Sequence, residues 1–336
     1  MSVRRQLLLQ LTDGQCHSGE VLAQALGISR AAVWKQIQTM QADGIQIESL
    51  PGQGYRLTTP IELLDHDMIK AGLPDALQQQ IHLEIFESLP STNTYLTQSQ
   101  PNEKKVHICL AEKQTDGRGR RGRAWQTPYG TTIALSLRWQ FAADTGRLAG
   151  LSLAVGVTIA ECLQEFGIEG VKLKWPNDLM INQAKLGGIL IDVSGDASGP
   201  CQLVIGVGLN MINSMASPEA GMSLVDQAWV DLASVVQGLP PSRNNLVAKL
   251  IQALVELLPR FEAQGFAAYQ NAFMQRDVLY QRTVDVQQAN QSYEGIAQGV
   301  DKQGALLIRK GRDILSVSAG EVSVKAHSES MHASVN

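Results

Sequence analysis

Three strand-like runs follow one another between residues 171 and 210 without a helix-like segment between them. They are Val171–Asp178, Lys185–Asp192 and Leu203–Asn210. Parallel strands need a crossover connection, usually a helix, so a doubly wound α/β sheet would alternate the two element types. The pattern instead predicts an α+β fold whose central sheet is mixed and largely antiparallel.

The rest of the chain predicts further strands and two long helices. Strands are expected at Ile81–Phe86, Lys105–Ala111 and Thr131–Trp139, a buried helix at Gly150–Phe166 and an amphipathic helix at Leu246–Phe261. Four or five short alternating strands follow in Gln281–Lys325. A length of 336 residues suits two or three domains. We expect the boundaries 1–65, 66–271 and 272–326, with a disordered tail at 327–336.

The first 65 residues have the pattern of a winged helix-turn-helix. Ser18 and Ser29 can each cap a helix, and Gly27 between them suits a sharp corner. Apolar residues on one face of the first of these helices are Val21, Leu22, Ala25 and Leu26. The segment 45–57 alternates on both sides of a turn at 51–54, which predicts the hairpin of the wing.

A winged helix predicts DNA binding through the start of its second capped helix. The candidate residues for the major groove are Ser29, Arg30, Trp34 and Lys35. Residues 1–65 hold five basic against six acidic side chains, so one copy would hold DNA weakly and a dimer is expected. The alternative is a structural or protein-binding module.

Four arginines occur within Gly117–Arg123, whose letters fit G-x-G-x-x-G. A dinucleotide fingerprint needs a long helix after the third glycine and an acidic residue about 20 residues later. Here Pro128 breaks the segment, and Arg138 stands where the acid is expected. Guanidiniums among glycines instead indicate a loop that grips phosphate and carboxylate oxygens. The alternative is an RNA-binding patch, although only Trp125 offers an aromatic platform.

Three further stretches are candidates for ligand contacts. Asn177 and Asp178 follow a Trp-Pro bend and could orient a hydroxyl or hold Mg²⁺, or form an ordinary Asx turn. Lys185 opens a very apolar strand, so it either snorkels or faces an anion. Gly206 and Gly208 leave one face of a strand bare, which suits a ligand or close packing.

Composition excludes several functional classes. A net charge of −4 and 18% charged residues do not describe a polybasic nucleic-acid coat. The N-terminus is a poor signal peptide, and no uninterrupted apolar stretch approaches the roughly 20 residues of a membrane span. The four cysteines are widely spaced, which favours reduced thiols and the cytoplasm. No histidine lies between 108 and 326, which disfavours Ser–His or Cys–His catalysis there.

Taken together, these stretches resemble the bacterial biotin protein ligases that also repress the biotin operon. The segments that carry the resemblance are Ser91–Asn93, Gly117–Arg123, Lys174–Asp178, Lys185–Leu190 and Gly206–Asn210, in the family's order. The resemblance covers nearly the whole chain. It implies a catalytic domain similar to class II aminoacyl-tRNA synthetases and a C-terminal SH3-like β-barrel. The segment 314–321 lacks a tryptophan found in some members, which leaves open whether that barrel contacts ATP.

The resemblance implies a two-step reaction. Biotin and ATP would give biotinyl-5′-AMP and pyrophosphate, and a lysine of the biotin carboxyl carrier protein of acetyl-CoA carboxylase would accept the biotin. Lys185, Arg118 and Arg120 would be the catalytic residues. The implied biotin site consists of Ser91, Thr92, Asn93, Gln114, Arg118, Gly119, Arg120 and Lys185. The implied nucleotide site consists of Gly117, Arg121, Trp125, Asn177, Asp178, Gly206 and Asn210, with Asp178 as a candidate Mg²⁺ ligand.

The resemblance also implies regulation. The adenylate would act as corepressor: it would order the arginine loop, and the resulting homodimer would bind the biotin operator through paired winged helices. The alternative is a ligase whose N-terminal module is only structural. A ligand-sensing repressor without catalysis is a third, weaker hypothesis.

Overall fold

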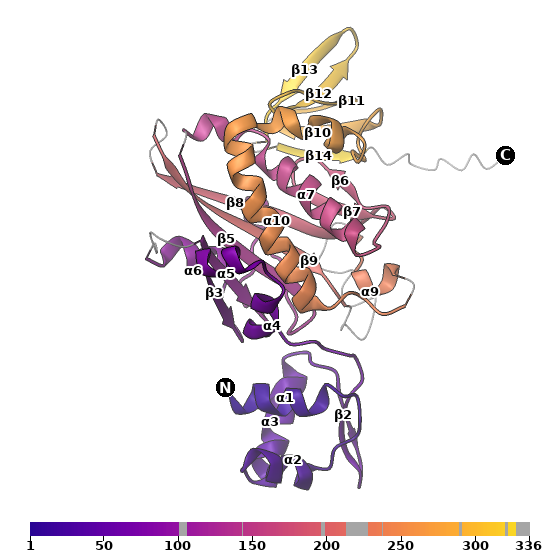
Figure 1. The fold of residues 1–336 in the computed structure, drawn as a ribbon. Coiled ribbons are helices and arrows are strands. Elements are labelled where there is room, and N and C mark those ends of the chain that lie inside the picture. The colour runs from indigo at the N-terminus through magenta and orange to yellow at the C-terminus, as the bar shows by residue number, and fades with distance from the viewer. Residues whose placement is uncertain are drawn as a thin grey trace, which may run out of the picture. The chain divides into compact units, whose positions relative to one another are not determined.

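A computed structural model describes residues 1–100, 106–142, 144–195, 199–212, 228–236, 238–288, 291–319 and 322–326 (Figure 1). These residues form two compact units. The first unit contains Met1–Trp139, Gln183–Asp192 and Leu203–Gln252. The second contains Gln140–Asn182, Val193–Gln202 and Ala253–Asn336. The tail expected at 327–336 lies outside the described residues.

The N-terminal segment folds into three helices and a hairpin. The helices are α1 (Val3–Leu11), α2 (Gly19–Leu26) and α3 (Arg30–Ala42), and strands β1 (Ile47–Leu50) and β2 (Gly54–Leu57) pair antiparallel. The side chains of Ser18 and Ser29 accept hydrogen bonds from the first turns of α2 and α3, and Gly27 ends α2 with a φ of 64°. The helix-turn-helix and its hairpin are therefore confirmed as elements.

One detail of the predicted apolar face of α2 is wrong. Val21 is 54% exposed and Ala25 is exposed, whereas Leu22 and Ala23 are buried. The helix is only eight residues long, so the contacts of a single turn decide which face packs inward, and the wider periodic pattern does not.

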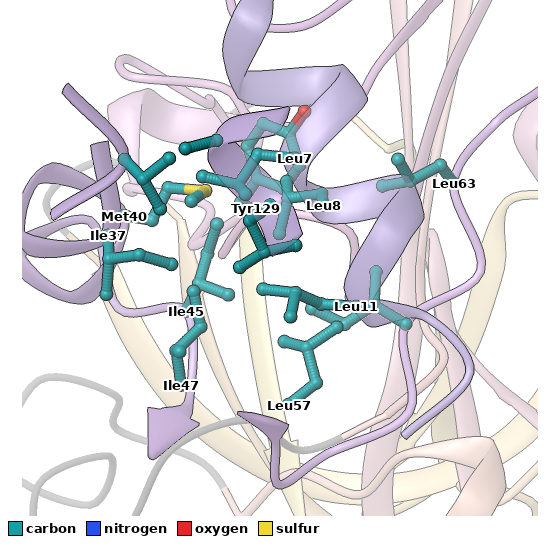
Figure 2. Close-up of a cluster of buried hydrophobic side chains, with 14 residues drawn as sticks. Leu7, Leu8, Leu11, Ile37, Met40, Ile45, Ile47, Leu57, Leu63 and Tyr129 are labelled. Atoms are coloured by element: carbon teal, nitrogen blue, oxygen red, sulfur yellow. The ribbon is translucent and has the colours of Figure 1, made fainter. Parts of the chain in front are cut away.

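The core of this segment includes residues from far along the chain. Figure 2 shows Leu7, Leu8 and Leu11 of α1 around the same cluster as Leu63 and Tyr129. Burial raises the pKa of the Tyr129 hydroxyl well above its ordinary range. The helix-turn-helix therefore packs its apolar face partly against the segment that follows the arginine loop.

A buried ionic cluster lies beside this core. The carboxylate of Glu112 is fully buried and accepts from Arg243 at 2.5 Å, from Arg5 at 3.3 Å and from the backbone N–H of Leu64 at 2.7 Å. The next residue, Lys113, donates to Asp43 at 2.9 Å, and this hydrogen bond is the main cause of the lowered pKa of Asp43. Removing one member of such a cluster would leave a buried charge without its partner.

The first unit contains a mixed sheet. Strands β3 (Ile81–Phe86), β4 (Val106–Ala111), β5 (Thr132–Phe141), β9 (Cys201–Asn210) and β8 (Ala184–Gly195) lie in that spatial order. The pair β3–β4 is parallel and β4–β5 antiparallel. Short helices α4 (His66–Ala71), α5 (Asp75–Gln80), α6 (Thr92–Gln98) and α9 (Leu232–Val235) complete the unit with the start of α10 (Arg243–Gln264). The mixed sheet agrees with the fold class expected from the sequence.

The second unit contains a buried helix and a smaller sheet. Helix α7 (Leu151–Glu165), strands β6 (Lys172–Lys174) and β7 (Asp178–Ile181) and helix α11 (Gln270–Met274) belong to it. The C-terminal strands β10 (Thr283–Gln288), β11 (Gln291–Val300), β12 (Leu306–Lys310), β13 (Asp313–Val317) and β14 (Val322–Ala326) form an antiparallel sheet of order β13-β12-β11-β10-β14.

The buried Trp175 connects two parts of the second unit. Its indole N–H donates to the carbonyl of Gly304 at 3.0 Å, and the bond to Pro176 is cis.

The segment Thr145–Glu165 has the length and hydropathy of a membrane-spanning helix, but it carries Arg147 and Glu161. The fold buries 56% of its most apolar window, as expected of a core helix.

Candidate functional site

The N-terminus of α6 presents a row of buried polar side chains. Ser91, Thr92 and Asn93 are each 4% exposed, and Ser91 caps the helix. The side-chain oxygen of Gln114 accepts from the backbone N–H of Thr92 at 2.8 Å and from its hydroxyl at 3.1 Å. The structure therefore brings the four residues expected at the biotin end of the site together.

Two residues that the sequence interpretation missed complete this network. The hydroxyl oxygen of Ser136 on β5 lies 2.7 Å from Thr92 Oγ1 and 2.6 Å from Asn93 Oδ1, within hydrogen-bond distance of both. Asn93 Nδ2 donates to the carboxylate of Asp192 on β8 at 2.9 Å. Ser136 is the one polar residue in the run Ile133–Leu137, and that exception to the pattern could have indicated it. A network of this kind fixes the donor and acceptor directions that a small polar ligand would meet.

Gly206 and Gly208 make room for side chains of the site. A Cβ atom at Gly206 would lie 2.2 Å from Asn93 Oδ1, and one at Gly208 would lie 2.7 Å from the ring of Trp125. The sequence left open whether Gly206 and Gly208 make room for a ligand or for close packing. The contacts of the described residues are those of close packing. The bare face of β9 lets Asn93 and Trp125 lie against the strand.

The arginine loop is anchored on α6. The guanidinium of Arg118 hydrogen-bonds to Thr94 Oγ1, one residue beyond Asn93. Two backbone bonds of 2.7 Å hold the loop, from Gly119 N–H to Arg123 O and from Trp125 N–H to Gly117 O. A Cβ atom at Gly117 would lie 2.4 Å from the carbonyl of Trp125, so only glycine fits this approach.

A short 3-10 turn, Arg120–Gly122, forms the tip of the loop. Arg121 there has a φ of 58°, in the left-handed region that non-glycine residues seldom adopt. The following segment contains no long helix up to β5, so the rejection of the dinucleotide fingerprint is confirmed. Arg118, Arg121 and Arg123 of the loop are exposed, and Arg120 is half-buried.

Lys185 lies over the indole of Trp125. Its Nζ is 5.5 Å from the ring centroid, and its backbone pairs with Ala228 and Val230 at 2.8 and 2.9 Å. Asn210 Nδ2 donates to the carbonyl of Val230 at 3.1 Å, which connects β9 to the same segment. An aromatic face therefore lies against the ammonium group of Lys185 beside the arginine loop.

Asn177 lies in the second unit at the turn before β7, and Asp178 is the first residue of that strand. The backbone N–H of Asn177 donates to Lys174 O at 3.2 Å, which closes the turn. This turn agrees with the local conformation expected from the sequence.

The expected DNA-contact residues lie together at the start of α3. Ser29 caps this helix, and Arg30, Trp34 and Lys35 are exposed on it. Trp34 is 56% exposed, which is unusual for a residue of this size. The arrangement is that of a recognition helix with its N-terminal residues free to contact a groove.

Comparisons with known proteins agree with this geometry. Family models match residues 3–56 (HTH domain), 85–210 (Biotin/lipoate A/B protein ligase family) and 282–325 (Biotin protein ligase C terminal domain). The chain is 37% identical to the Bifunctional ligase/repressor BirA of Salmonella typhimurium over 95% of this chain and 97% of that protein. The chain belongs to the bifunctional ligase/repressor BirA family. The protein of the same name from Escherichia coli is also 37% identical, over 97% of this chain.

Other members of the BirA family are more distant, and one solved structure reproduces the fold. BirA of Bacillus subtilis is 26% identical over 91% of this chain. The biotin protein ligase of Aquifex aeolicus, solved with biotin and ATP, aligns with a TM-score of 0.62 over 73% of this chain and 99% of its own, at 22% identity. The resemblance stated from the motifs is therefore confirmed.

Proposed function

We propose that the chain activates biotin with ATP and transfers the biotinyl group to a lysine of the biotin carboxyl carrier protein of acetyl-CoA carboxylase. Membership of the BirA family, whose HTH and ligase domains both match here, is the main support. In the first step the biotin carboxylate attacks the α-phosphate, and pyrophosphate leaves. In the second step the lysine amine attacks the acyl carbon of biotinyl-5′-AMP, and AMP leaves.

The observation that carries this proposal is the anchoring of the arginine loop on α6. The helix that presents Thr92 and Asn93 also holds Arg118 through Thr94. A ligand bound at the helix start would therefore meet the loop's cations at its other end. Two negatively charged reactants need such cations before they can approach each other.

The residues of the biotin end have distinct roles in this proposal. Ser91, Thr92, Asn93 and Gln114 would hydrogen-bond the polar head group, while Gly119 lets the loop backbone come close. Arg118, Arg120 and Lys185 would neutralise the carboxylate and the α-phosphate as charge builds up between them. No described histidine is needed for a proton transfer in this reaction.

The nucleotide end is assigned from the matching motifs of the chain. We assign Gly117, Arg121, Trp125, Gly206 and Asn210 to the adenylate. Asn177 and Asp178 would serve the phosphates and their Mg²⁺. Mg²⁺ takes oxygen ligands and commonly uses one or two carboxylates with substrate phosphates, which the carboxylate of Asp178 fits.

Regulation is the second part of the proposal. The adenylate-bound chain would form a homodimer that binds the biotin operator through Ser29, Arg30, Trp34 and Lys35 of two recognition helices. The alternative is a ligase whose N-terminal module does not bind an operator. A gel shift on biotin-operon promoter DNA separates the two, since only the first requires a shift that depends on biotin and ATP.

The finer architecture is also a proposal. We assign residues 1–65 to a winged helix, 66–271 to a ligase domain similar to class II aminoacyl-tRNA synthetases and 272–326 to an SH3-like barrel. We also propose a cytoplasmic location, which reduced cysteines and an ATP-dependent reaction support. The described residues contain no disulfide, and Cys109, Cys162 and Cys201 are buried.

Biotin-dependent exchange of pyrophosphate into ATP tests the first step. Lys185→Ala should abolish this exchange. Lys310→Ala is a matched control, because Lys310 Nζ lies 5.2 Å from the ring centroid of Tyr293 in the C-terminal sheet. Exchange at a near wild-type rate in Lys185→Ala would show that the role given to this lysine is wrong.

Arg118→Gly tests the closing of the loop. Without the guanidinium that reaches Thr94, adenylation should continue while the adenylate leaves the protein faster. Stopped-flow fluorescence measures its release. A variant that releases adenylate at the wild-type rate or more slowly contradicts the loop's role.

A further inference from the structure

Three side chains with metal-ligating atoms lie on one face of the β3–β4 pair. His82 and His107 are Cα partners in the parallel register, and Glu84 follows His82 by two residues. Alternation along a strand turns all three toward the same face. The two imidazole rings meet edge to face with centroids 4.7 Å apart, and the ligand atoms of the three residues lie within 4.8 Å of one another.

We propose that His82, Glu84 and His107 bind one divalent metal ion of the borderline-soft class, such as Zn²⁺. Two imidazole nitrogens and one carboxylate oxygen, with water in the fourth position, form a known tetrahedral ligand set for Zn²⁺. Mg²⁺ prefers oxygen ligands and octahedral geometry, so this site differs in kind from that of the ion accompanying ATP. The proposed ligase reaction uses none of the three residues.

To admit an ion, Glu84 and His107 would have to move apart, because two ligands of one tetrahedral ion lie farther apart than a hydrogen-bonded pair. Glu84 Oε2 hydrogen-bonds to His107 Nε2 and lies 3.7 Å from His82 Nε2. The ion would take the place of the proton between Glu84 and His107. His107 Nδ1 is buried without a hydrogen-bond partner among the described residues, so the proton can move to that nitrogen without breaking a bond.

The charge state of the cluster also suits a metal ion. A histidine coordinates a metal ion through its neutral ring, and the ring of His107 is buried, with 5% of the residue exposed. Glu84 supplies one negative charge, and both of its oxygens accept from the Tyr95 hydroxyl at 3.0 Å. Arg138, the β5 partner of His107, adds an opposing positive charge. We therefore expect weaker binding than at a structural zinc site with four protein ligands.

Titration with Co²⁺ tests the proposal on the untagged full-length chain after treatment with a chelator and without nucleotide. Tetrahedral Co²⁺ absorbs visible light, and Zn²⁺ should displace it. We expect one ion per chain and an affinity reduced roughly tenfold or more in His82→Ala and Glu84→Gln. The side chain of His82 is 44% exposed, so its removal should leave the fold intact, as circular dichroism would verify.

His66→Ala is the matched control, since the His66 ring is also exposed and pairs with a carboxylate, that of Asp67 at 3.1 Å. This variant should bind Co²⁺ as the wild type does. The proposal is overturned if the wild type gives no visible absorption, if His82→Ala binds with unchanged affinity, or if excess Mg²⁺ displaces the Co²⁺.

Discussion

Asp277 should make the stability of the second unit depend on pH. Its Oδ1 accepts from the backbone N–H of Leu279 at 2.8 Å, whereas Oδ2 is buried without a partner among the described residues. Burial is the main cause of a pKa raised from 3.8 to about 6. A difference of that size corresponds to about 3 kcal/mol, at 1.36 kcal/mol for each pH unit.

The sign follows from the direction of this shift. Below pH 3.8 the carboxyl group is protonated in both the folded and the unfolded chain, so the group costs nothing. Above about pH 6 it is ionised in both states, and the folded chain carries the full cost of a buried charge. The contribution of Asp277 to stability therefore falls as the pH rises from about 4 to 6.

Asp277→Asn isolates this effect, because asparagine keeps the acceptor for Leu279 and cannot ionise. The free energy of unfolding of the variant, minus that of the wild type, should rise by about 3 kcal/mol between pH 3.5 and pH 7.5. A buried amide without an acceptor adds only a constant offset of about 1–3 kcal/mol. Urea unfolding at several pH values measures the difference, and hydrogen exchange of the Val278 amide reports it locally. Asp313→Asn, at an exposed position, is the control. A difference that stays constant over this range refutes the reasoning.

Three further substitutions test other parts of the chain. Gly206→Ala would force Asn93 aside and should weaken biotin binding roughly tenfold or more by calorimetry; unchanged affinity would contradict this packing argument. Glu112→Gln should lower the free energy of unfolding by about 3–5 kcal/mol, because Arg243 stays buried with its main partner neutralised; a loss under about 1 kcal/mol would count against it. Trp34→Ala should abolish the operator gel shift and leave pyrophosphate exchange unchanged, and a parallel loss of exchange would reject a role limited to DNA.

The sequence predicts most of the local elements because their signals are local. The caps of α2 and α3 and the left-handed Gly27 depend on one or two side chains, and the structure confirms each. Strand β3 has the predicted bounds, and β8 extends the predicted run by one residue at its start and three at its end. Strand β7 was missed, since it begins at Asp178, directly after the turn at 175–177, and gives only four positions of pattern.

Contacts between distant residues could not be predicted in the same way. In the sequence, Glu112 is an ordinary polar residue after a predicted strand. In the structure it is fully buried and pairs with Arg5 and Arg243. Nothing within a few residues of Glu112 indicates either partner. The role of Ser136 likewise depends on β5 lying beside the start of α6, which no periodicity reveals.

The consecutive residues Glu112, Lys113 and Gln114 connect the N-terminal segment with the start of α6. Three consecutive residues contact Arg5 of α1, Asp43 at the end of α3, and Thr92 at the proposed biotin end of the site. We propose that a ligand that shifts Gln114 also shifts the contacts of Glu112 and Lys113 with the N-terminal segment. Coupling of this kind needs two arrangements that the ligand distinguishes by its binding free energy. If Lys113→Ala leaves adenylate binding intact but removes its effect on operator affinity, the coupling passes through this segment; an unchanged effect would exclude it.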